Sequence, residues 1–487
     1  MNITGRILVL ITACITYSCG CPDRDIKVED TLPPLFPDYC DVTVPVSVAP
    51  LNFRINGSDK SHVIISGTKG KVAIRSKGKV RIPEKKWRRL LKDHTDAFLT
   101  VNVEARMGKK WTRFRPFTIR IKSDPVDQWI AYRLIAPGYE SYSDMGIYQR
   151  DLRSFRQKNV ITNRFPANTC MNCHSFHNYN PERMMFHIRG DISGTVLIDG
   201  NDVIKLNTKV KETIANCIYP YWHPSGEYIA FSVNNISQVF HSVPDKRVEV
   251  FDSKSDIVVY DIRNNTIITD TVISSERSFE TFPSFSPDGK SLYFCSAVSA
   301  SQPENYNKVK YNLCRIDFDP STGRFGNSTD TLVNASSANK SVSFPRVSPD
   351  GRYLLYTLSD YGNFSIWHRE ADLYIIDLES GIVSPADALN STDTESYHSW
   401  SSNSRWVIFS SRRMDGLYTR PYIAYFSEEG SFSKPFMLPQ KDPDLYELSL
   451  KSFNVPEFIR GEIKKDSRSL IKVIRSPAMD VKFEIRD

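Results

Sequence analysis

The chain has 487 residues, of which 40% are hydrophobic and 12% aromatic, and its formal net charge is +7. This length exceeds one ordinary hydrophobic core, so two or more domains are expected, and the composition excludes an intrinsically disordered protein. The positive charge is spread along the chain and is dense only at 83–91, which we interpret as the solvated face of a helix. Nucleic acid is therefore not an expected partner.

The first 21 residues have the form of an export signal. An apolar run at 7–18 is too short for a permanent membrane span. The run ends among Cys14, Cys19 and Cys21 and resembles bacterial lipoprotein signals, in which a cysteine that follows small residues is acylated. The length of the run favours Cys19, and an ordinary cleaved secretory signal is the alternative. The resemblance implies a lipoprotein of the bacterial cell envelope, on the periplasmic or outer-membrane side, held to the membrane by a lipid anchor.

A Pro- and Asp-rich stretch at 22–39 is predicted to be a tether. Alternating apolar segments then predict a small β-sandwich-like domain over 40–123, of about immunoglobulin size. Its one good helix is expected at 83–93, with Pro83 in the first turn, where no backbone N–H is needed. The domain shows no catalytic set.

A repeat dominates the next part of the chain, residues 125–440. Each copy holds a short apolar strand, a turn of the Pro-Asp-Gly type and a second alternating strand. The copies begin Tyr219-Pro-Tyr-Trp, Phe282-Pro-Ser-Phe, Phe344-Pro-Arg-Val and Tyr397-His-Ser-Trp. One hairpin cannot bury its own apolar face, so the units must stack, and radial stacking predicts a β-propeller.

Blades are expected to begin near 129, 170, 219, 282, 344 and 397, six in all. The repeats resemble those of TolB-like propeller proteins, so the expected fold is all-β, a six-bladed TolB-like β-propeller preceded by the small β-sandwich-like domain. The tail, 441–487, contains two candidates for closing the ring, Tyr446-Glu-Leu-Ser-Leu and Leu470-Ile-Lys-Val-Ile-Arg, and the sequence does not choose between them.

Where the second blade should have its Phe-Pro-x-Phe strand, the chain reads Cys170-Met-Asn-Cys173-His174. Cys-x-x-Cys-His is the signature of covalent c-type haem attachment. Two thiols add to the porphyrin vinyl groups, and the histidine becomes the proximal iron ligand. The sequence therefore predicts one haem c bound to Cys170 and Cys173, with His174 on the iron. The alternatives are a Cys170–Cys173 disulfide or redox pair, a zinc site, and a relic motif without haem.

The distal iron ligand would decide what such a haem does. The candidates are His398, His177 and Met184, with Met185 and His187 also close in sequence. His398 is of interest because it occupies the proline position of the repeat, as His174 does.

A cross-strand disulfide is predicted between Cys295 and Cys314, on expected neighbouring strands. Two buried free thiols fit these positions as well.

Two functions follow from these observations. The first is electron transfer, or service as a redox partner of an envelope protein, by a haem-bearing, membrane-anchored propeller. The second is a non-catalytic binding module for protein or glycan partners, as in TolB-like proteins. An enzyme is the less favoured reading, because the chain has no Gly-x-Ser-x-Gly motif. A metal-dependent lyase is a further alternative, because His174, His223 and His398 are expected to line the central channel and could hold a metal.

Overall fold

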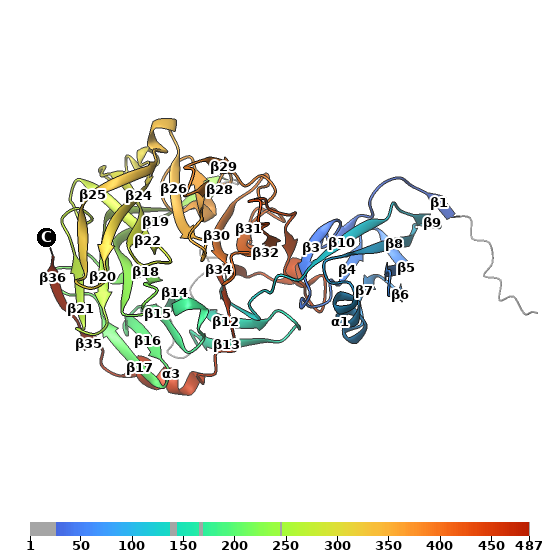
Figure 1. Ribbon diagram of the computed structural model, residues 1–487, viewed down its shortest axis with the longest axis horizontal. Coiled ribbons are helices and arrows are strands. Elements are labelled where there is room, and N and C mark those ends of the chain that lie inside the picture. Colours follow the sequence, from blue (N-terminus) through green and yellow to red (C-terminus); the bar gives the residue numbers. More distant parts are fainter. Residues whose placement is uncertain (1–25, 137–143, 165–168, 244–245, 487) are drawn as a thin grey trace, which may run out of the picture.

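The computed structural model describes residues 26–136, 144–164, 169–243 and 246–486 (Figure 1). The leader cysteines Cys14, Cys19 and Cys21 lie outside these residues, so the lipidation site stays a prediction. Within the described ranges, none of the helices is long and apolar enough to cross a membrane. The described chain forms a small N-terminal domain and a larger all-β body, joined side by side (Figure 1).

The small domain is built from two sheets and one helix. Its helix, α1 (Glu84–Asp93), follows Pro83 and buries Trp87, Leu90 and Leu91. The three-stranded sheet contains β2 (Leu35–Phe36), β4 (Phe53–Ile55) and β7 (Lys79–Val80). The seven-stranded sheet contains β1 (Ile26–Val28), β3 (Val42–Pro45), β5 (Ser58–Gly67), β6 (Gly70–Ser76), β8 (Phe98–Met107), β9 (Lys110–Arg113) and β10 (Phe117–Lys122).

The predicted tether is wrong for residues 26–39, which belong to the small domain. β1 pairs in parallel with β9, and β2 pairs with β4. Leu35 and Tyr39 are buried in the core of the domain. The prolines that suggested a tether therefore lie between short edge strands, where a missing backbone N–H costs little.

The larger body is a β-propeller whose residues from Trp129 to Ile485 form six sheets. The innermost strands of successive sheets are neighbours, and the last of them lies beside the first. The innermost strands are β14 (Cys170–Phe176), β18 (Cys217–Trp222), β22 (Ser278–Phe285), β26 (Ser341–Val347), β30 (Glu395–Trp400) and β34 (Ser452–Ile459).

The outer strands follow antiparallel in each sheet. From β34 outward, the strands of the first sheet are β11 (Trp129–Ile135), β12 (Met145–Asp151) and β13 (Gln157–Thr162). From β14 outward, those of the second sheet are β15 (Arg183–Arg189), β16 (Gly194–Asp199) and β17 (Asp202–Asn207). From β18 outward, those of the third sheet are β19 (Tyr228–Val243), β20 (Lys246–Asp261) and β21 (Thr266–Thr269). From β22 outward, the strands of the fourth sheet are β23 (Ser291–Val298), β24 (Asn312–Asp319) and β25 (Arg324–Val333). From β26 outward, those of the fifth sheet are β27 (Tyr353–Ser359), β28 (Asp372–Asp377) and β29 (Val383–Pro385). From β30 outward, those of the sixth sheet are β31 (Trp406–Ser411), β32 (Arg420–Tyr425) and β33 (Phe436–Met437).

Every innermost strand has the same irregularity at the same place. The residue at the first position of the Phe-Pro-x-Phe quartet has a positive φ of 50–54°, and the ladder to the second strand slips there. Such a bulge re-aims a side chain. The six residues are Cys173, Tyr219, Phe282, Phe344, Tyr397 and Val455. The four aromatic rings among them pack on one another, with centroids 4.5 Å apart for Tyr219 and Phe282 and 4.9 Å apart for Phe344 and Tyr397. We call the six residues the axial plug.

Neither of the two segments proposed to close the ring does so. Tyr446 lies in the short helix α2 (Leu445–Leu448), and 470–475 belongs to helix α3 (Ser467–Arg475). The strand that closes the ring is β34, which pairs antiparallel with β11. After α3, β35 (Met479–Asp480) and β36 (Lys482–Ile485) add parallel strands to the outer edges of the second and third sheets.

The predicted disulfide is also wrong. Cys295 and Cys314 are free thiols, and Cys314 pairs across the ladder with Phe294 instead of Cys295. A register offset of one residue sends the two side chains to opposite faces of the sheet. Each therefore packs in a different hydrophobic cluster.

Candidate functional site

The Cys-x-x-Cys-His motif lies on β14, at the axis of the propeller. Cys170 is partly exposed and lines a small cavity, whereas Cys173 is 5% exposed and belongs to the axial plug. His174 is 2% exposed and is not among the residues that line that cavity. It lies near the backbone carbonyls of Ala131 and Val455, on the two strands of the neighbouring sheet.

His174 and His398 have the same structural position. Both take the place of proline in the quartet and both face the second strand of the preceding sheet. His398 donates from Nε2 to the carbonyl oxygen of Leu355 at 2.9 Å, while neither ring nitrogen of His174 has a hydrogen-bond partner among the described residues. Burial lowers the pKa of each imidazole to about 3, so both are neutral. These histidines fit a packing role between sheets.

The other candidate iron ligands do not approach His174. His177 contacts the carbonyl oxygen of Pro224 at 3.0 Å, and His187 contacts the Thr195 hydroxyl at 3.2 Å. Met184 and Met185 are fully buried in two different hydrophobic clusters. In the described part of the chain no three His, Cys, Asp or Glu side chains gather as a metal site.

A haem does not fit this arrangement of the motif. Two thiols and a neutral imidazole are suitable donors, but the cavity beside Cys170 holds about 130 Å³. Small-molecule and cofactor sites occupy roughly 300–1,000 Å³. His174 is packed against two strands, so no space beside its ring is open to a macrocycle.

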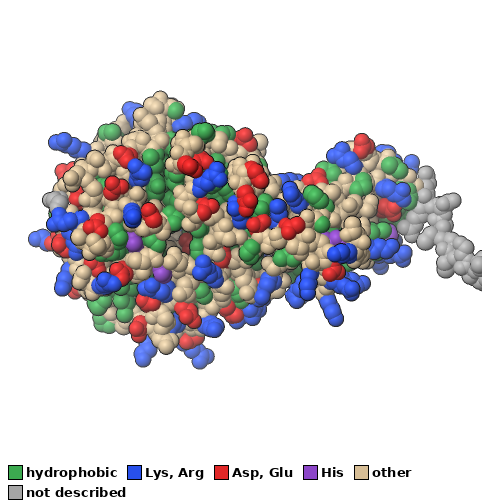
Figure 2. Space-filling model, viewed as in Figure 1, with side chains coloured by type: hydrophobic (Ala, Val, Ile, Leu, Met, Phe, Trp, Pro, Cys, Tyr) green, Lys and Arg blue, Asp and Glu red, His purple; other side chains and the backbone are tan. Residues whose placement is uncertain are grey.

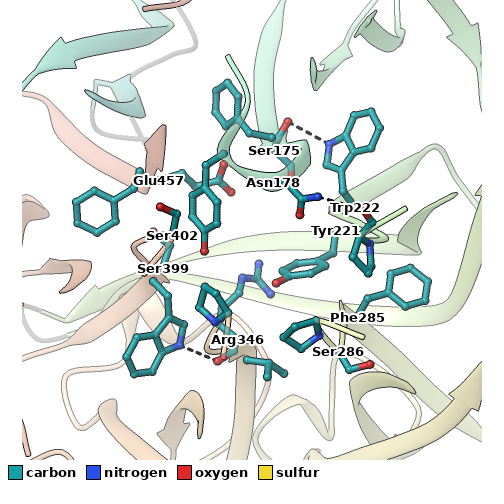
Figure 3. A pocket seen from close by; sticks show the side chains of 18 of the residues that line it. Ser175, Asn178, Tyr221, Trp222, Phe285, Ser286, Arg346, Ser399, Ser402 and Glu457 are labelled. Atoms are coloured by element: carbon teal, nitrogen blue, oxygen red, sulfur yellow. Dashed lines mark hydrogen bonds between the residues drawn. The ribbon is translucent and has the colours of Figure 1, made fainter. Parts of the chain in front are cut away.

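A larger cavity opens on the other side of the axial plug, with a volume of about 360 Å³ (Figure 3). The cavity is lined by residues of the quartets that come after the plug residue in sequence. The side chain at the third position of the quartet points into the cavity. This position is held by Ser175, Tyr221, Arg346, Ser399 and Glu457 in five of the six sheets. We call this space the axial cavity.

Three charged residues line the axial cavity, and two of them lie on innermost strands: Glu457 on β34 and Arg346 on β26 (Figure 3). The third, Arg460, follows β34 and is exposed. Burial raises the pKa of the Glu457 carboxyl to about 8, although Arg346 acts in the opposite direction. Burial likewise lowers the pKa of Arg346. No described side chain donates a hydrogen bond to the Glu457 carboxyl group, so at neutral pH it is mostly protonated and is available to a ligand.

Aromatic side chains form much of the cavity wall. Trp222 donates its indole N–H to the Ser175 carbonyl at 3.3 Å, and Trp400 donates to the Arg346 carbonyl at 3.0 Å. These bonds fix the two rings at the rim. The Arg346 guanidinium lies 5.2 Å from the centre of the Tyr221 ring, a cation–π contact that orients it.

Sequence reasoning missed this site, although a signal was present. The third residue of the quartet lines the axial cavity in five of the six sheets, and in Phe344-Pro-Arg-Val it is the charged Arg346. Val455-Pro-Glu-Phe is a further copy that supplies the second charge. It went unnoticed because Val replaces the aromatic residue and no Pro-Asp-Gly turn follows.

No family model matches the chain, and no curated protein matches its sequence. Among solved structures, it resembles prolyl oligopeptidase B from Galerina marginata at 11% identity, covering 69% of this chain and 42% of that one, with a TM-score of 0.35. It also resembles a DUF4784 family protein from Bacteroides caccae at 9% identity (71% and 93% covered, TM-score 0.29) and an ancestral GH74 enzyme at 10% identity (64% and 39%, TM-score 0.36). The chain spans less than two thirds of the oligopeptidase, and likenesses this distant concern the fold alone.

Proposed function

We propose that this protein is a non-catalytic, TolB-like propeller binding module that takes a polar segment of a partner into the axial cavity. The observation that carries the proposal is the pair of Glu457 and Arg346 in a cavity of about 360 Å³. That volume lies within the usual range for small-molecule sites. The described lining residues include a single carboxyl group, whereas glycoside hydrolysis ordinarily uses two.

The chemistry of the lining favours a glycan over a peptide. The indole rings of Trp222 and Trp400 are 4% and 3% exposed, so each offers an apolar edge of the wall to the C–H groups of a sugar. A protonated Glu457 carboxyl and the Arg346 guanidinium offer donors to sugar oxygens, and Ser399 lies among the lining residues beside them. On the face of the molecule shown in Figure 2, charges of both signs mix over the surface.

Binding to an oligosaccharide array tests this function. The wild-type protein should retain defined glycans, and Arg346→Gln and Glu457→Ala should each weaken retention about tenfold or more, since hydrogen-bonding groups of the half-buried cavity wall would be lost. Glu276→Gln serves as the matched control because its side chain is 92% exposed. Failure to bind any glycan, or equal binding by all variants, would overturn the glycan proposal; retention on a peptide library instead would favour a protein partner.

We further propose that the protein is exported to the bacterial cell envelope and anchored through a leader cysteine. The support is the apolar run before Cys19. Metabolic labelling with a radioactive fatty acid should mark the wild-type protein and not Cys19→Ala. Label that survives in Cys19→Ala and disappears in Cys14→Ala or Cys21→Ala would move the site; no label in any form would remove the anchor.

Haem attachment, and with it electron transfer or a redox-partner role, stays a prediction. The lack of a hydrogen-bond partner at His174 is the one structural observation in its favour. Pyridine haemochrome spectroscopy on protein made in a host competent for haem attachment tests it. Absence of a Soret band would remove the prediction, and its presence would require β14 to leave the packing described above.

A further inference from the structure

The small cavity on the Cys170 side of the axial plug carries a chemistry different from that of the axial cavity. Three arginines line it, Arg133, Arg189 and Arg412, and none of its described lining residues is Asp or Glu. We propose that this cavity binds a small oxyanion, the phosphate or carboxylate group of a ligand. The proposal is independent of what enters the axial cavity, because the axial plug separates the two.

Arg133 provides the main argument. It lies on β11, is 7% exposed and lines the cavity. Its Nε has no hydrogen-bond partner, and no described residue forms an ion pair with it. A guanidinium stays charged at any physiological pH, and a buried charge without a counter-ion is costly. An anion in the cavity would provide the missing counter-charge.

Arg412 adds a second buried cation from another part of the ring. It follows β31, is 4% exposed, and its guanidinium lies 3.3 Å from the centre of the Trp367 ring, which also lines the cavity. Stacking on an aromatic face orients a guanidinium, and a guanidinium is the side chain whose planar fork matches an oxyanion best.

Arg189 is the least available of the three arginines. The buried carboxyl of Asp252 lies close enough to interact with it. Asp252 itself accepts hydrogen bonds from Asn234 at 2.7 Å and Asn363 at 2.5 Å, and it does not line the cavity. Among the described residues that line the cavity, three carry a positive charge and none carries a negative charge.

The size and the neutral groups of the cavity suit a small ligand group. Its volume of about 130 Å³ corresponds to about four water molecules at roughly 30 Å³ each. Asn172 and Asn454 line it and carry amide donors. One wall is the hairpin of β19 and β20, in which Ile236 pairs with Asp252 and Val250 pairs with Gln238.

Phosphate binding by the whole protein tests the proposal. We would measure the Tm and the heat of titration with sodium phosphate, sodium acetate and, at matched ionic strength, sodium chloride. The wild-type Tm should rise saturably with one of the oxyanions and not with chloride. The stronger of phosphate and acetate identifies the ligand group.

Two variants locate the effect. Arg133→Gln should weaken oxyanion binding at least tenfold while leaving the Tm without anion unchanged or higher, because an uncompensated charge is removed. Arg89→Gln removes the same charge from an exposed position and should bind as the wild type does. If Arg133→Gln does not fold, Arg412→Gln replaces it, with the same expected loss of oxyanion binding.

The opposite results are equally clear. No saturable rise in Tm with phosphate or acetate would overturn the proposal. An equal response in Arg133→Gln, Arg412→Gln and the wild type would assign the effect to adventitious surface binding and overturn it too. Glu457→Ala should keep the oxyanion response, so that failure of the axial cavity as a glycan site and failure of the oxyanion site can be told apart.

Discussion

At the scale of single residues, burial decides the chemistry of the axial cavity. Glu457 and Arg346 are ordinary charged residues whose pKa values shift because the ring of sheets removes most water around them. A carboxyl group with a pKa of about 8 is a hydrogen-bond donor at neutral pH and loses this property in mild alkali. Ligand binding through Glu457 should therefore weaken above pH 8.

The same shift makes stability depend on pH. Between the unfolded pKa of Glu, about 4.3, and the folded value of about 8, the native state binds the extra proton, so Glu457 destabilises the fold as pH rises. We expect Glu457→Gln to lose less stability than the wild type between pH 5 and 8, by up to about 1.4 kcal/mol for each unit of pKa shift removed. Urea unfolding at a series of pH values measures this.

The matched control for this prediction is Glu276→Gln, whose side chain is 92% exposed. Its stability should follow the wild-type curve across the series. Asp252 and Glu280, whose pKa values burial raises to about 7, titrate in the same window and remain in every protein compared. Parallel curves for the wild type and Glu457→Gln would show that Glu457 titrates normally.

The cysteines differ in how far a reagent can reach them. Cys170 is partly exposed, while Cys40, Cys173, Cys217, Cys295 and Cys314 are buried. Burial also raises the pKa of Cys173 and Cys217, which keeps their thiols protonated and unreactive. Native protein treated with iodoacetamide at pH 8 should carry label on Cys170 ahead of these five by mass spectrometry. Equal labelling of Cys170 and Cys173 would mean that β14 opens, as haem attachment requires.

At the scale of elements, the innermost strands show how much of the fold can be predicted from the sequence. The quartets at Tyr219, Phe282, Phe344 and Tyr397 predicted four of these strands, because aromatic residues and prolines at a bulge leave a visible pattern. The positive φ at Val455 follows the same backbone rule without the aromatic signal. The position of β34 is thus set by the ring, which needs a partner for β11, more than by local preference.

The two tail helices explain why the closing strand was misassigned. Leu470 and Ile474 are buried four residues apart, which is helical spacing, and the Asp466 side chain accepts hydrogen bonds from the backbone of Arg468 and Ser469 as an N-cap. The mostly apolar run at 470–474 is compatible with a strand as well as with a helix. Short apolar runs do not separate helix from strand, and the cap was the discriminating signal.

Truncation tests the role of β34. A chain ending at residue 450 loses this strand and leaves both the edge of β11 and the ring open, so we expect aggregation or loss of cooperative unfolding. A chain ending at residue 476 loses only β35 and β36, most of whose side chains are exposed, and should stay folded with a Tm a few degrees lower. Size-exclusion chromatography and thermal unfolding distinguish the two. Equal behaviour of the two truncated chains would contradict closure by β34.

At the scale of the whole molecule, the small domain is fastened to the propeller through the segment after β33. Asn52 donates to the carbonyl oxygens of Gln440 and Lys441 at 3.2 and 3.1 Å and accepts from the Ile82 backbone at 2.9 Å. Arg54 contacts Asp444 and Glu447, and one hydrophobic cluster extends across both domains. The two domains should therefore unfold together.

Asn52→Leu tests this coupling, because it removes two buried hydrogen bonds and one partly buried hydrogen bond to backbone groups. We expect a loss of about 2–4 kcal/mol in the free energy of unfolding, on the usual cost of unsatisfied buried groups. Asn201→Ala, at an exposed turn, should change stability little. Urea unfolding followed by fluorescence gives both values. Two separate transitions in the wild type would contradict a coupled pair of domains.

The candidate site was less predictable than the fold because it depends on what the ring brings together. Arg346 and Glu457 lie more than a hundred residues apart, and only the stacking of sheets places them in one cavity. The motif at Cys170 was visible in the sequence, but the bulge at Cys173 decided where its side chains point. Local spacing therefore predicted a chemistry that the packing does not accommodate.

Calorimetric titration with the strongest glycan from the array, in wild-type protein and in Arg346→Gln, tests the central claim most directly. The account predicts one glycan per wild-type chain and an affinity at least tenfold lower in the variant. Equal affinities, or no glycan that binds the wild-type protein, would contradict it.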